Sequence, residues 1–259
     1  AEKTATYFAA QLGGVMKAFT PQAVLNDPPV FTPSPPKTGK GEILVLQQSD
    51  EERFATYKGI VRESFAKKQS VFLCVPTIAD VEEAAVFLER GIETFTFVFH
   101  NRHSPKAQVA LWGKALNMTH PILVIATPLF LSLPRTDIGT YLFDREYHEA
   151  YRTLTRPFVD GRRLGEYLAE GSPVRVVFGN TALRVETVYK KEKGEYNALM
   201  PLKYRFPSGL EERVVQLTGE QLISEDLLSV LSRAVKRGER AMLFVARKGL
   251  SPTTHCRDC

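Results

Sequence analysis

Asp144 is an acidic residue that ends a short run of strand-forming residues, Gly139-Thr-Tyr-Leu-Phe. If this run is a strand of a parallel α/β sheet, Asp144 lies at the carboxyl end, where such sheets bind their ligands. An aspartate in this place usually holds the Mg²⁺ ion of a nucleotide, and the next residue is then a carboxylate that prepares the attacking water. Here the next residue is Arg145. Capping of the following turn is an open alternative role for Asp144.

Two other groups of residues have types that could bind a metal ion or nucleic acid. Cys256 and Cys259 have the CxxC spacing of half a zinc site, which would need further ligands beyond the end of this sequence. Several basic residues could contact DNA phosphates, and the open alternative for each is a structural or solvated role. The candidate DNA-binding residues are His100, Arg102, Lys106, Arg135, Arg162 and Arg247.

The composition is that of an ordinary globular protein. A chain of 259 residues with 44% hydrophobic content can bury a large core in one or two domains. Its 34 basic and 29 acidic residues give a net charge of +5, which suits nucleic acid without requiring it. No apolar run reaches the roughly 20 residues of a membrane span and no signal peptide opens the chain, so no membrane association and a cytoplasmic location are expected.

Strand-like and helix-like segments alternate after residue 41, which predicts an α/β fold with a parallel sheet and crossover helices. The expected strands are 43–46, 71–75, 95–99, 121–126, 141–143 and 174–178, followed by 214–217 and 241–245. The expected helices are 50–67, 80–89, 106–116, 156–169 and 224–237. Residues 3–19 have the spacing of one or two short helices, whereas the proline-rich residues 21–41 predict an extended linker.

Several short motifs, in this order and at this spacing, resemble the superfamily 2 helicase core of the PriA-type replication-restart helicases (primosomal protein N′). The resemblance covers about residues 41–259. The motifs are VPTI at 75–78, HNRHS at 100–104, ATPLF at 126–130, DREY at 144–147, RPFVDGR at 156–162, FGNTA at 178–182 and GERAMLFVARKG at 238–249.

The resemblance implies a domain organisation. Residues 1–20 are expected to be a remnant of an N-terminal domain that binds DNA 3′ ends, and residues 21–41 the linker. Residues 42–195 would form the first RecA-like helicase lobe. Residues 196–259 would begin a second RecA-like lobe and the zinc-binding region. The chain begins at Ala1 without a methionine and stops on the second cysteine of a CxxC, so both ends are expected to be cuts through a longer protein.

The chain departs from the family where ATP would bind. The family's phosphate loop falls on residues 47–57, which lack its glycines and contain the acidic run 50–52; Arg53 takes the place of the lysine and Phe54 that of the hydroxyl residue. The degenerate nucleotide site then consists of Arg53, Asp144, Arg145, Glu146 and Asn180. We expect no catalytic residue here and no bound ATP or Mg²⁺. Arg53, Arg145 and Asp144 could form a salt-bridged plug in the cleft, or they could have ordinary surface roles.

These observations favour a PriA-like primosomal protein in DNA replication restart that binds forked, branched or single-stranded DNA without hydrolysing ATP. Replication-restart or single-strand-binding proteins are the expected partners. One alternative is an active ATP-dependent 3′-to-5′ DNA helicase that reaches ATP through unusual residues. A second alternative is a structural or interaction protein that has lost DNA binding.

Overall fold

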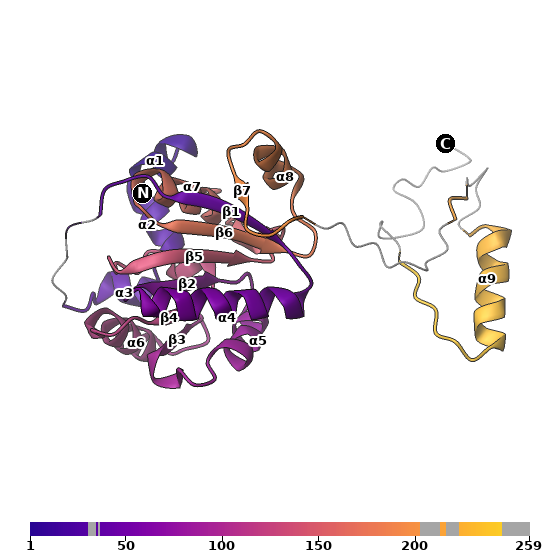
Figure 1. The fold of residues 1–259 in the computed structure, drawn as a ribbon, viewed down its shortest axis with the longest axis horizontal. Helices are drawn as coiled ribbons and strands as arrows, with labels where there is room; N and C mark the ends of the chain where they lie inside the picture. Colours follow the sequence, from indigo (N-terminus) through magenta and orange to yellow (C-terminus); the bar gives the residue numbers. More distant parts are fainter. Residues whose placement is uncertain (31–34, 36, 203–212, 216–222, 245–259) are drawn as a thin grey trace, which may run out of the picture. The chain divides into compact units, whose positions relative to one another are not determined.

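The computed structural model of the chain describes residues 1–30, 35, 37–202, 213–215 and 223–244. The chain divides into two compact units, Ala1–Tyr204 and Arg205–Cys259. The described strands of the first unit form one seven-stranded, all-parallel sheet with the order β3-β4-β2-β5-β6-β1-β7 (Figure 1). The strands are β1 Glu42–Gln47, β2 Ser70–Cys74, β3 Thr96–Phe99, β4 Leu123–Ala126, β5 Ile138–Asp144, β6 Arg175–Asn180 and β7 Asn197–Ala198.

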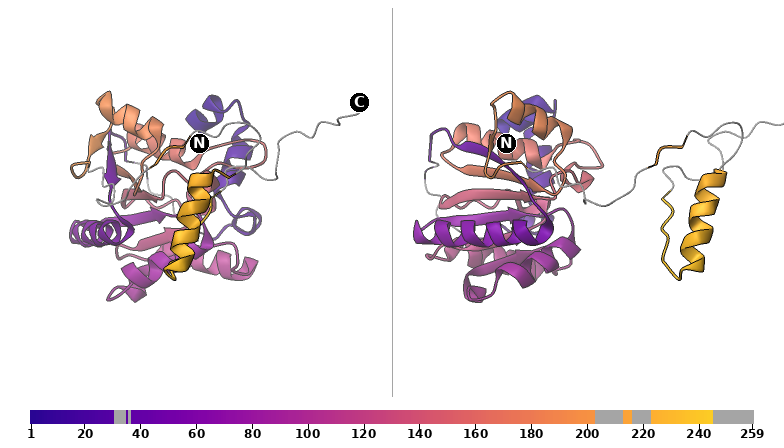
Figure 2. Two further views of the ribbon diagram at one scale, coloured as in Figure 1. Left: turned by 90° about the vertical axis from the view of Figure 1, so that its right-hand side faces the viewer. Right: turned by 45° about the vertical axis from the view of Figure 1, so that its right-hand side comes forward.

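Helices pack on both faces of this sheet (Figure 2). On one face, Val71 and Leu73 of β2 pack with α4 and α5, and on the other Phe72 and Cys74 pack with α2, α6 and α7. Strands that are buried on both faces are apolar at successive positions, and all five residues of β2 are buried. The helices of the first unit are α1 Glu2–Tyr7, α2 Leu12–Phe19, α3 Gln22–Asn26, α4 Asp50–Ala66, α5 Ile78–Leu88, α6 Pro105–Asn117, α7 Gly161–Gly171 and α8 Val185–Glu192.

Capping side chains fix where α4 and α5 begin. Before α4, the Glu52 carboxylate accepts hydrogen bonds from Ser49 Oγ at 3.0 Å and from the Ser49 amide at 3.4 Å. Before α5, the hydroxyl of Thr77 accepts from the Asp80 amide at 3.2 Å while the Asp80 carboxylate accepts from the Thr77 amide at 2.9 Å. Both helices therefore present their first turns at the carboxyl end of the sheet, immediately after β1 and β2.

The N-terminal helices belong to the core of the first unit. Val15 and Phe19 of α2 are buried in the cluster beneath the sheet, and the Phe19 carbonyl accepts from the Ser132 amide at 3.2 Å. Helix α3 packs against α6 and buries Val24. The expectation of an extended chain throughout 21–41 is therefore wrong for Gln22–Asn26, because Pro21 precedes a proline-free stretch whose Val24 reaches the core.

The parallel sheet expected from the sequence is confirmed, and each of the six strands expected between residues 43 and 178 is present. The helix expected at 156–169 instead begins at Gly161. Asp160 caps it by accepting a hydrogen bond from the Arg162 amide at 2.9 Å, and Thr153 accepts from the Val159 amide in the preceding turn at 2.9 Å.

In the second unit, helix α9, Glu225–Lys236, confirms the helix expected at 224–237. The Ser224 hydroxyl caps it by accepting from the Leu227 amide at 3.1 Å. Residues 241–244 were expected to form most of a strand, but they have no regular structure. The expected strand at 214–217 likewise has no regular structure at 214–215, and its last two residues lie outside the described part of the chain.

Candidate functional site

Asp144, at the carboxyl end of β5, forms a buried ion pair with Arg53 from the first turn of α4. Arg53 Nε donates to Asp144 Oδ1, and a terminal guanidinium nitrogen donates to Oδ2 at 3.3 Å. Tyr57, one helical turn further on, donates its hydroxyl to Oδ1 at 2.9 Å. The Arg53 and Asp144 side chains are 0% and 1% exposed. The carboxylate of Asp144 is thus held by three hydrogen bonds from the chain's own side chains.

The remaining donors of Arg53 are also engaged. One terminal nitrogen donates to the Gln48 carbonyl at 3.0 Å and to the Thr181 hydroxyl at 3.5 Å, and the other donates to Asp50 at 2.8 Å. With the two bonds to Asp144, all five N–H groups of the guanidinium have acceptors. Burial alone would lower the pKa of Arg53, but the hydrogen bonds and charge of Asp144 raise it, so the side chain stays charged.

Gly179 of β6 lets α4 lie this close to the sheet. A Cβ atom at Gly179 would lie 1.9 Å from the Tyr57 hydroxyl oxygen and 3.0 Å from Arg53 Cδ. Both distances are shorter than van der Waals contact, so only a residue without a side chain fits here. The glycine in the FGNTA motif therefore positions Arg53 and Tyr57 over Asp144.

Arg145 forms a second, more exposed set of ion pairs next to the first. Its guanidinium donates to Asp80, to Glu83 at 2.9 Å and to Asp50 at 3.1 Å, with its side chain 27% exposed. Burial lowers the pKa of Arg145, but Asp80, Glu83 and Asp50 outweigh that effect and raise it. The backbone at Arg145 has φ of 49°, the left-handed conformation that non-glycine residues rarely adopt.

Asp50 joins the two sets because one carboxylate oxygen binds Arg53 and the other binds Arg145. Burial raises its pKa, but the hydrogen bonds and charges of the two arginines lower it overall. We call the whole group the ion-pair cluster; it contains two arginines and four carboxylates and has a net negative formal charge. Its members are Arg53, Arg145, Asp50, Asp80, Glu83 and Asp144.

An open pocket of about 680 Å³ lies beside the ion-pair cluster. Asp50, Asp80 and Arg145 line it together with Asn180. This size is within the range of roughly 300–1,000 Å³ found for small-ligand sites, so volume alone does not exclude a nucleotide. The pocket differs from a phosphate site because the carboxylates of Asp50 and Asp80 face it, and carboxylates repel phosphate.

Glu146 and Asn180 have structural contacts. Glu146 is fully buried, and its carboxylate accepts from the Arg184 amide at 2.6 Å and the Thr187 hydroxyl at 3.1 Å, which ties α8 to the end of β5. Burial raises the pKa of Glu146. Asn180 donates its side-chain amide to the Ala182 carbonyl and closes the turn after β6.

Three of the sequence-predicted DNA-binding residues lie together after the carboxyl end of β3. The rings of His100 and His103 stack with centroids 4.0 Å apart, and burial followed by the charge of His103 lowers the pKa of His100. Arg102 is exposed and pairs with Glu82 at 3.0 Å. Lys106 is exposed in the first turn of α6.

Arg135 and Arg162 instead have internal partners. Arg135, before the amino end of β5, binds Asp137 at 2.6 Å and the carbonyls of Ala115 and Met118; its side chain is 6% exposed. Arg162 binds Asp160 at 2.6 Å and the Glu146 carbonyl at 2.5 Å, with 9% of its side chain exposed. The other three predicted site residues, Arg247, Cys256 and Cys259, lie outside the described part of the chain.

Reasoning from the sequence missed three residues of the site, namely Tyr57, Asp80 and Glu83. Tyr57 follows Arg53 by four residues, so a helix from residue 50 puts both on one face. Asp80 follows Thr77 by three residues, which is the spacing of a capping box after a strand. These signals could have placed Tyr57 and Asp80 near the carboxyl end of the sheet, whereas no comparable signal marks Glu83.

No protein-family model matches the chain. Among solved structures, the helicase domain of Pyrococcus furiosus Hef covers 61% of this chain and 35% of its own at a TM-score of 0.41 and 15% identity. None of the described helices has the length and apolar character needed to cross a membrane.

The chain is distantly similar to replication restart protein PriA over most of its length. It is 24% identical to the Helicobacter pylori protein over 216 residues, which are 83% of this chain and 34% of the relative. The Treponema pallidum protein is 27% identical over 75% of this chain and 30% of its own length, and the Bacillus subtilis protein 23% over 86% and 27%. The chain thus spans about a third of the length of these relatives.

Proposed function

We propose that this chain is a PriA-related protein of DNA replication restart whose helicase core acts as a DNA-binding scaffold and neither binds nor hydrolyses ATP. The similarity to replication restart protein PriA over most of the chain supports the process. Branched or single-stranded DNA and proteins of replication restart, including single-strand-binding proteins, are the partners that this role implies. Cys256 and Cys259 would contribute half of a zinc site to the scaffold.

The buried pair of Arg53 and Asp144 is the observation that carries the loss of ATP binding. To hold a nucleotide's Mg²⁺, Asp144 would have to leave Arg53 and Tyr57. Breaking a buried ion pair costs about 3–5 kcal/mol, which would weaken the binding of a ligand that requires it by roughly two to four orders of magnitude.

Electrostatics oppose ATP as well. A triphosphate in the pocket beside Arg145 would face Asp50 and Asp80, and the ion-pair cluster has more carboxylates than arginines. Arg145 follows Asp144 where a water-activating carboxylate would be needed, and its own guanidinium is occupied by three acidic side chains. The ion-pair cluster therefore has neither the net positive charge that binds phosphates nor a water-activating carboxylate at position 145.

Calorimetric titration with Mg·ATP, followed by phosphate release with forked DNA, tests this proposal. We expect no binding heat up to millimolar ATP and no DNA-stimulated hydrolysis. Asp144→Ala serves as the specificity control, because hydrolysis that this substitution abolished would establish the alternative of an active helicase. Fluorescence anisotropy with labelled forked DNA, with and without ATP, then tests DNA binding separately.

A structural protein without DNA binding is the second candidate, and one observation favours it. Arg135 and Arg162, two of the six residues predicted to contact DNA, have their guanidinium groups engaged by internal acceptors. This leaves fewer cations for phosphates. Absence of binding to forked and single-stranded DNA at low salt would favour this candidate.

A further inference from the structure

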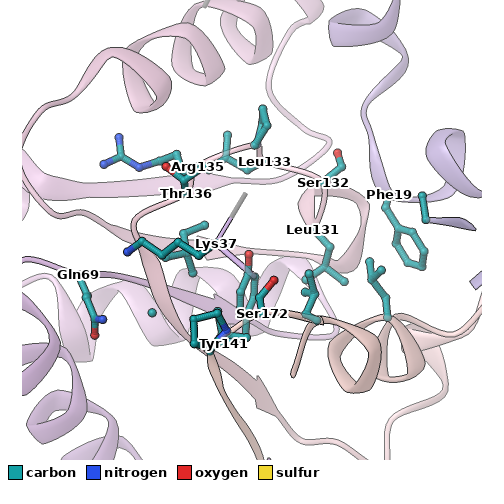
Figure 3. Close-up of a pocket in the computed structure, with 18 of the residues that line it drawn as sticks. Phe19, Lys37, Gln69, Leu131, Ser132, Leu133, Arg135, Thr136, Tyr141 and Ser172 are labelled. Atoms are coloured by element: carbon teal, nitrogen blue, oxygen red, sulfur yellow. The ribbon is translucent and has the colours of Figure 1, made fainter. Parts of the chain in front are cut away.

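A second pocket lies at the amino end of β5, at the opposite end of that strand from Asp144. Its volume is about 580 Å³, within the range of roughly 300–1,000 Å³ typical of small-ligand sites. Figure 3 shows its lining side chains, which come from α2, the segment before β5, β5 itself and α7, and from the segments before β1, β2 and β6 that contain Lys37, Gln69 and Ser172. The walls are mainly apolar, with Phe19, Leu131, Leu133, Ile138, Leu164 and Leu168 among them.

Tyr141 gives this pocket an unpaired polar group. The residue is only 7% exposed, and its ring stacks on Phe72 with centroids 5.7 Å apart. The hydroxyl has no hydrogen-bond partner among the residues that the structure describes. The hydroxyl oxygen is not among the fully buried polar atoms that lack a partner, so it is open to the pocket and can donate a hydrogen bond to a ligand atom there.

The hydroxyl of Tyr141 is protonated and can donate a hydrogen bond. Burial, followed by the negative charge of Asp137, raises the pKa of Tyr141, so the hydroxyl keeps its proton at neutral pH. Arg135 also lines the pocket, but Asp137 and the end of α6 occupy its guanidinium. The Tyr141 hydroxyl therefore favours a hydrogen-bond acceptor on the ligand.

Lys37 supplies the charge at this pocket. It is an exposed lining residue and makes no ion pair within the described segments. No acidic side chain is among the lining residues that the structure describes. An apolar cavity with an available cation and a hydroxyl donor is complementary to a small apolar molecule with an anionic, acceptor-rich head.

We propose that this pocket binds a small apolar carboxylic acid, whose hydrocarbon part lies between α2 and α7 and whose carboxylate is bound by Tyr141 and Lys37. This site is independent of the ion-pair cluster, which lies at the other end of β5. It does not depend on DNA or ATP binding by the chain.

Octanoate is a suitable probe, with octanol and octylammonium as uncharged and cationic analogues of equal chain length. In calorimetric titrations of the chain we expect octanoate to bind at least fivefold more tightly than octanol, and octylammonium to bind least. Tyr141→Phe should weaken octanoate binding about three- to tenfold, the usual effect of one hydrogen bond. Lys37→Gln should weaken octanoate but not octanol.

Matched controls are Tyr189→Phe and Lys40→Gln, which make the same chemical changes at residues that do not line this pocket. Both should bind octanoate like the parent chain. No binding of any probe, or octanoate binding that Tyr141→Phe leaves unchanged, would overturn the site. Equal affinity for octanoate and octanol would overturn the carboxylate as the recognised head. Tyr141→Phe removes only an unpaired hydroxyl, so the variant should fold like the parent chain. Circular dichroism of the variant checks that it is folded.

Discussion

At the scale of single residues, the ion-pair cluster surrounds the carboxyl end of β5 with contacts between the chain's own side chains. Asp144 stands at the strand end where an aspartate can hold a metal ion, yet Arg53 and Tyr57 bind both of its oxygens. Removing one partner of a buried ion pair leaves the other charge without compensation, which destabilises a fold. Both carboxylate oxygens of Asp144 are therefore occupied by the chain's own side chains.

Removing one partner of this pair should destabilise the first unit. Asp144→Asn removes the buried carboxylate and leaves the buried Arg53 charge with only the half-exposed Asp50 as its acidic partner, and we expect the free energy of unfolding to fall by about 3–5 kcal/mol. Trp112, the chain's single tryptophan, is buried in the first unit and reports unfolding in urea by its fluorescence.

The double variant Arg53→Met with Asp144→Asn tests whether the cost comes from the unpaired charge. We expect it to be less destabilised than the sum of its two single variants, because neither buried charge then remains without a partner. Additive effects of the two substitutions would show that the pair is not coupled, contrary to the geometry of the hydrogen bonds.

At the scale of elements, the approach of α4 to β6 decides whether the cluster can form. Gly179→Ala should push Tyr57 and Arg53 away, since its Cβ would overlap the Tyr57 hydroxyl. We expect a loss of about 1–3 kcal/mol in the free energy of unfolding. Gly59→Ala is the matched control on α4 itself, where an added Cβ meets no atom within 4 Å.

At Gly59 the alanine should be neutral or stabilise the helix by up to about 1 kcal/mol, because glycine is the poorer helix former. Urea unfolding of both variants, followed by Trp112 fluorescence, gives the comparison. Equal effects at the two glycines would contradict the close packing of α4 on β6.

A second contact between elements should make stability depend on pH. Glu166 of α7 accepts from Lys190 of α8 at 2.7 Å and from Tyr196 at 2.6 Å, and Arg163 also binds it. Burial raises the pKa of Glu166, but these three partners lower it overall. A folded-state pKa below the unfolded value of about 4.3 adds stability above that pH, which is lost as the pH falls through the folded value.

We therefore expect Glu166→Gln to cost about 2 kcal/mol at pH 7 and progressively less below about pH 4.3. Urea unfolding of parent and variant at pH 7, 5, 4 and 3 measures the difference. Glu170→Gln is the control on the same helix, because its exposed pair with Lys3 should contribute little at any pH. A cost for Glu166→Gln that stayed constant down to pH 3 would be inconsistent with the lowered pKa.

At the scale of the whole molecule, the sequence predicted the layout of the first unit better than the partners of its charges. The alternation of apolar segments and the place of Asp144 at a strand end follow from local pattern, and the sheet order brings Arg53 to it. The capping-box spacing could have placed Asp80 near the carboxyl end of the sheet, but the pairing of Arg145 with Asp80 and Glu83 could not be predicted in this way. Asp80 and Glu83 come from a helix more than 60 residues earlier, and only the folded chain brings them near.

The internal partners of Arg135 and Arg162 could not be predicted from the sequence either. A basic residue in a sequence predicts a surface cation, because arginine is rarely buried unless it is paired. Their partners Asp137 and Asp160 are two residues away in the sequence, but the backbone carbonyls that complete each site are set by tertiary structure. The net charge of +5 therefore does not show how many cations are available to DNA.

DNA binding should instead depend on the exposed cations after β3. If the scaffold binds single-stranded DNA there, Arg102→Ala and Lys106→Ala should each weaken binding to all sequences alike, since phosphate contacts carry no sequence information. Each lost contact should flatten the log–log dependence of affinity on salt by about 0.7. Anisotropy titrations between 50 and 200 mM salt (about the range over which such binding weakens strongly) measure both quantities.

Lys114→Ala removes the same charge near the other end of α6, so it should leave affinity and slope unchanged. If Lys114→Ala had the same effect as Lys106→Ala, binding would depend on net charge alone, and if neither variant had any effect, the cations after β3 would not be the DNA-binding surface.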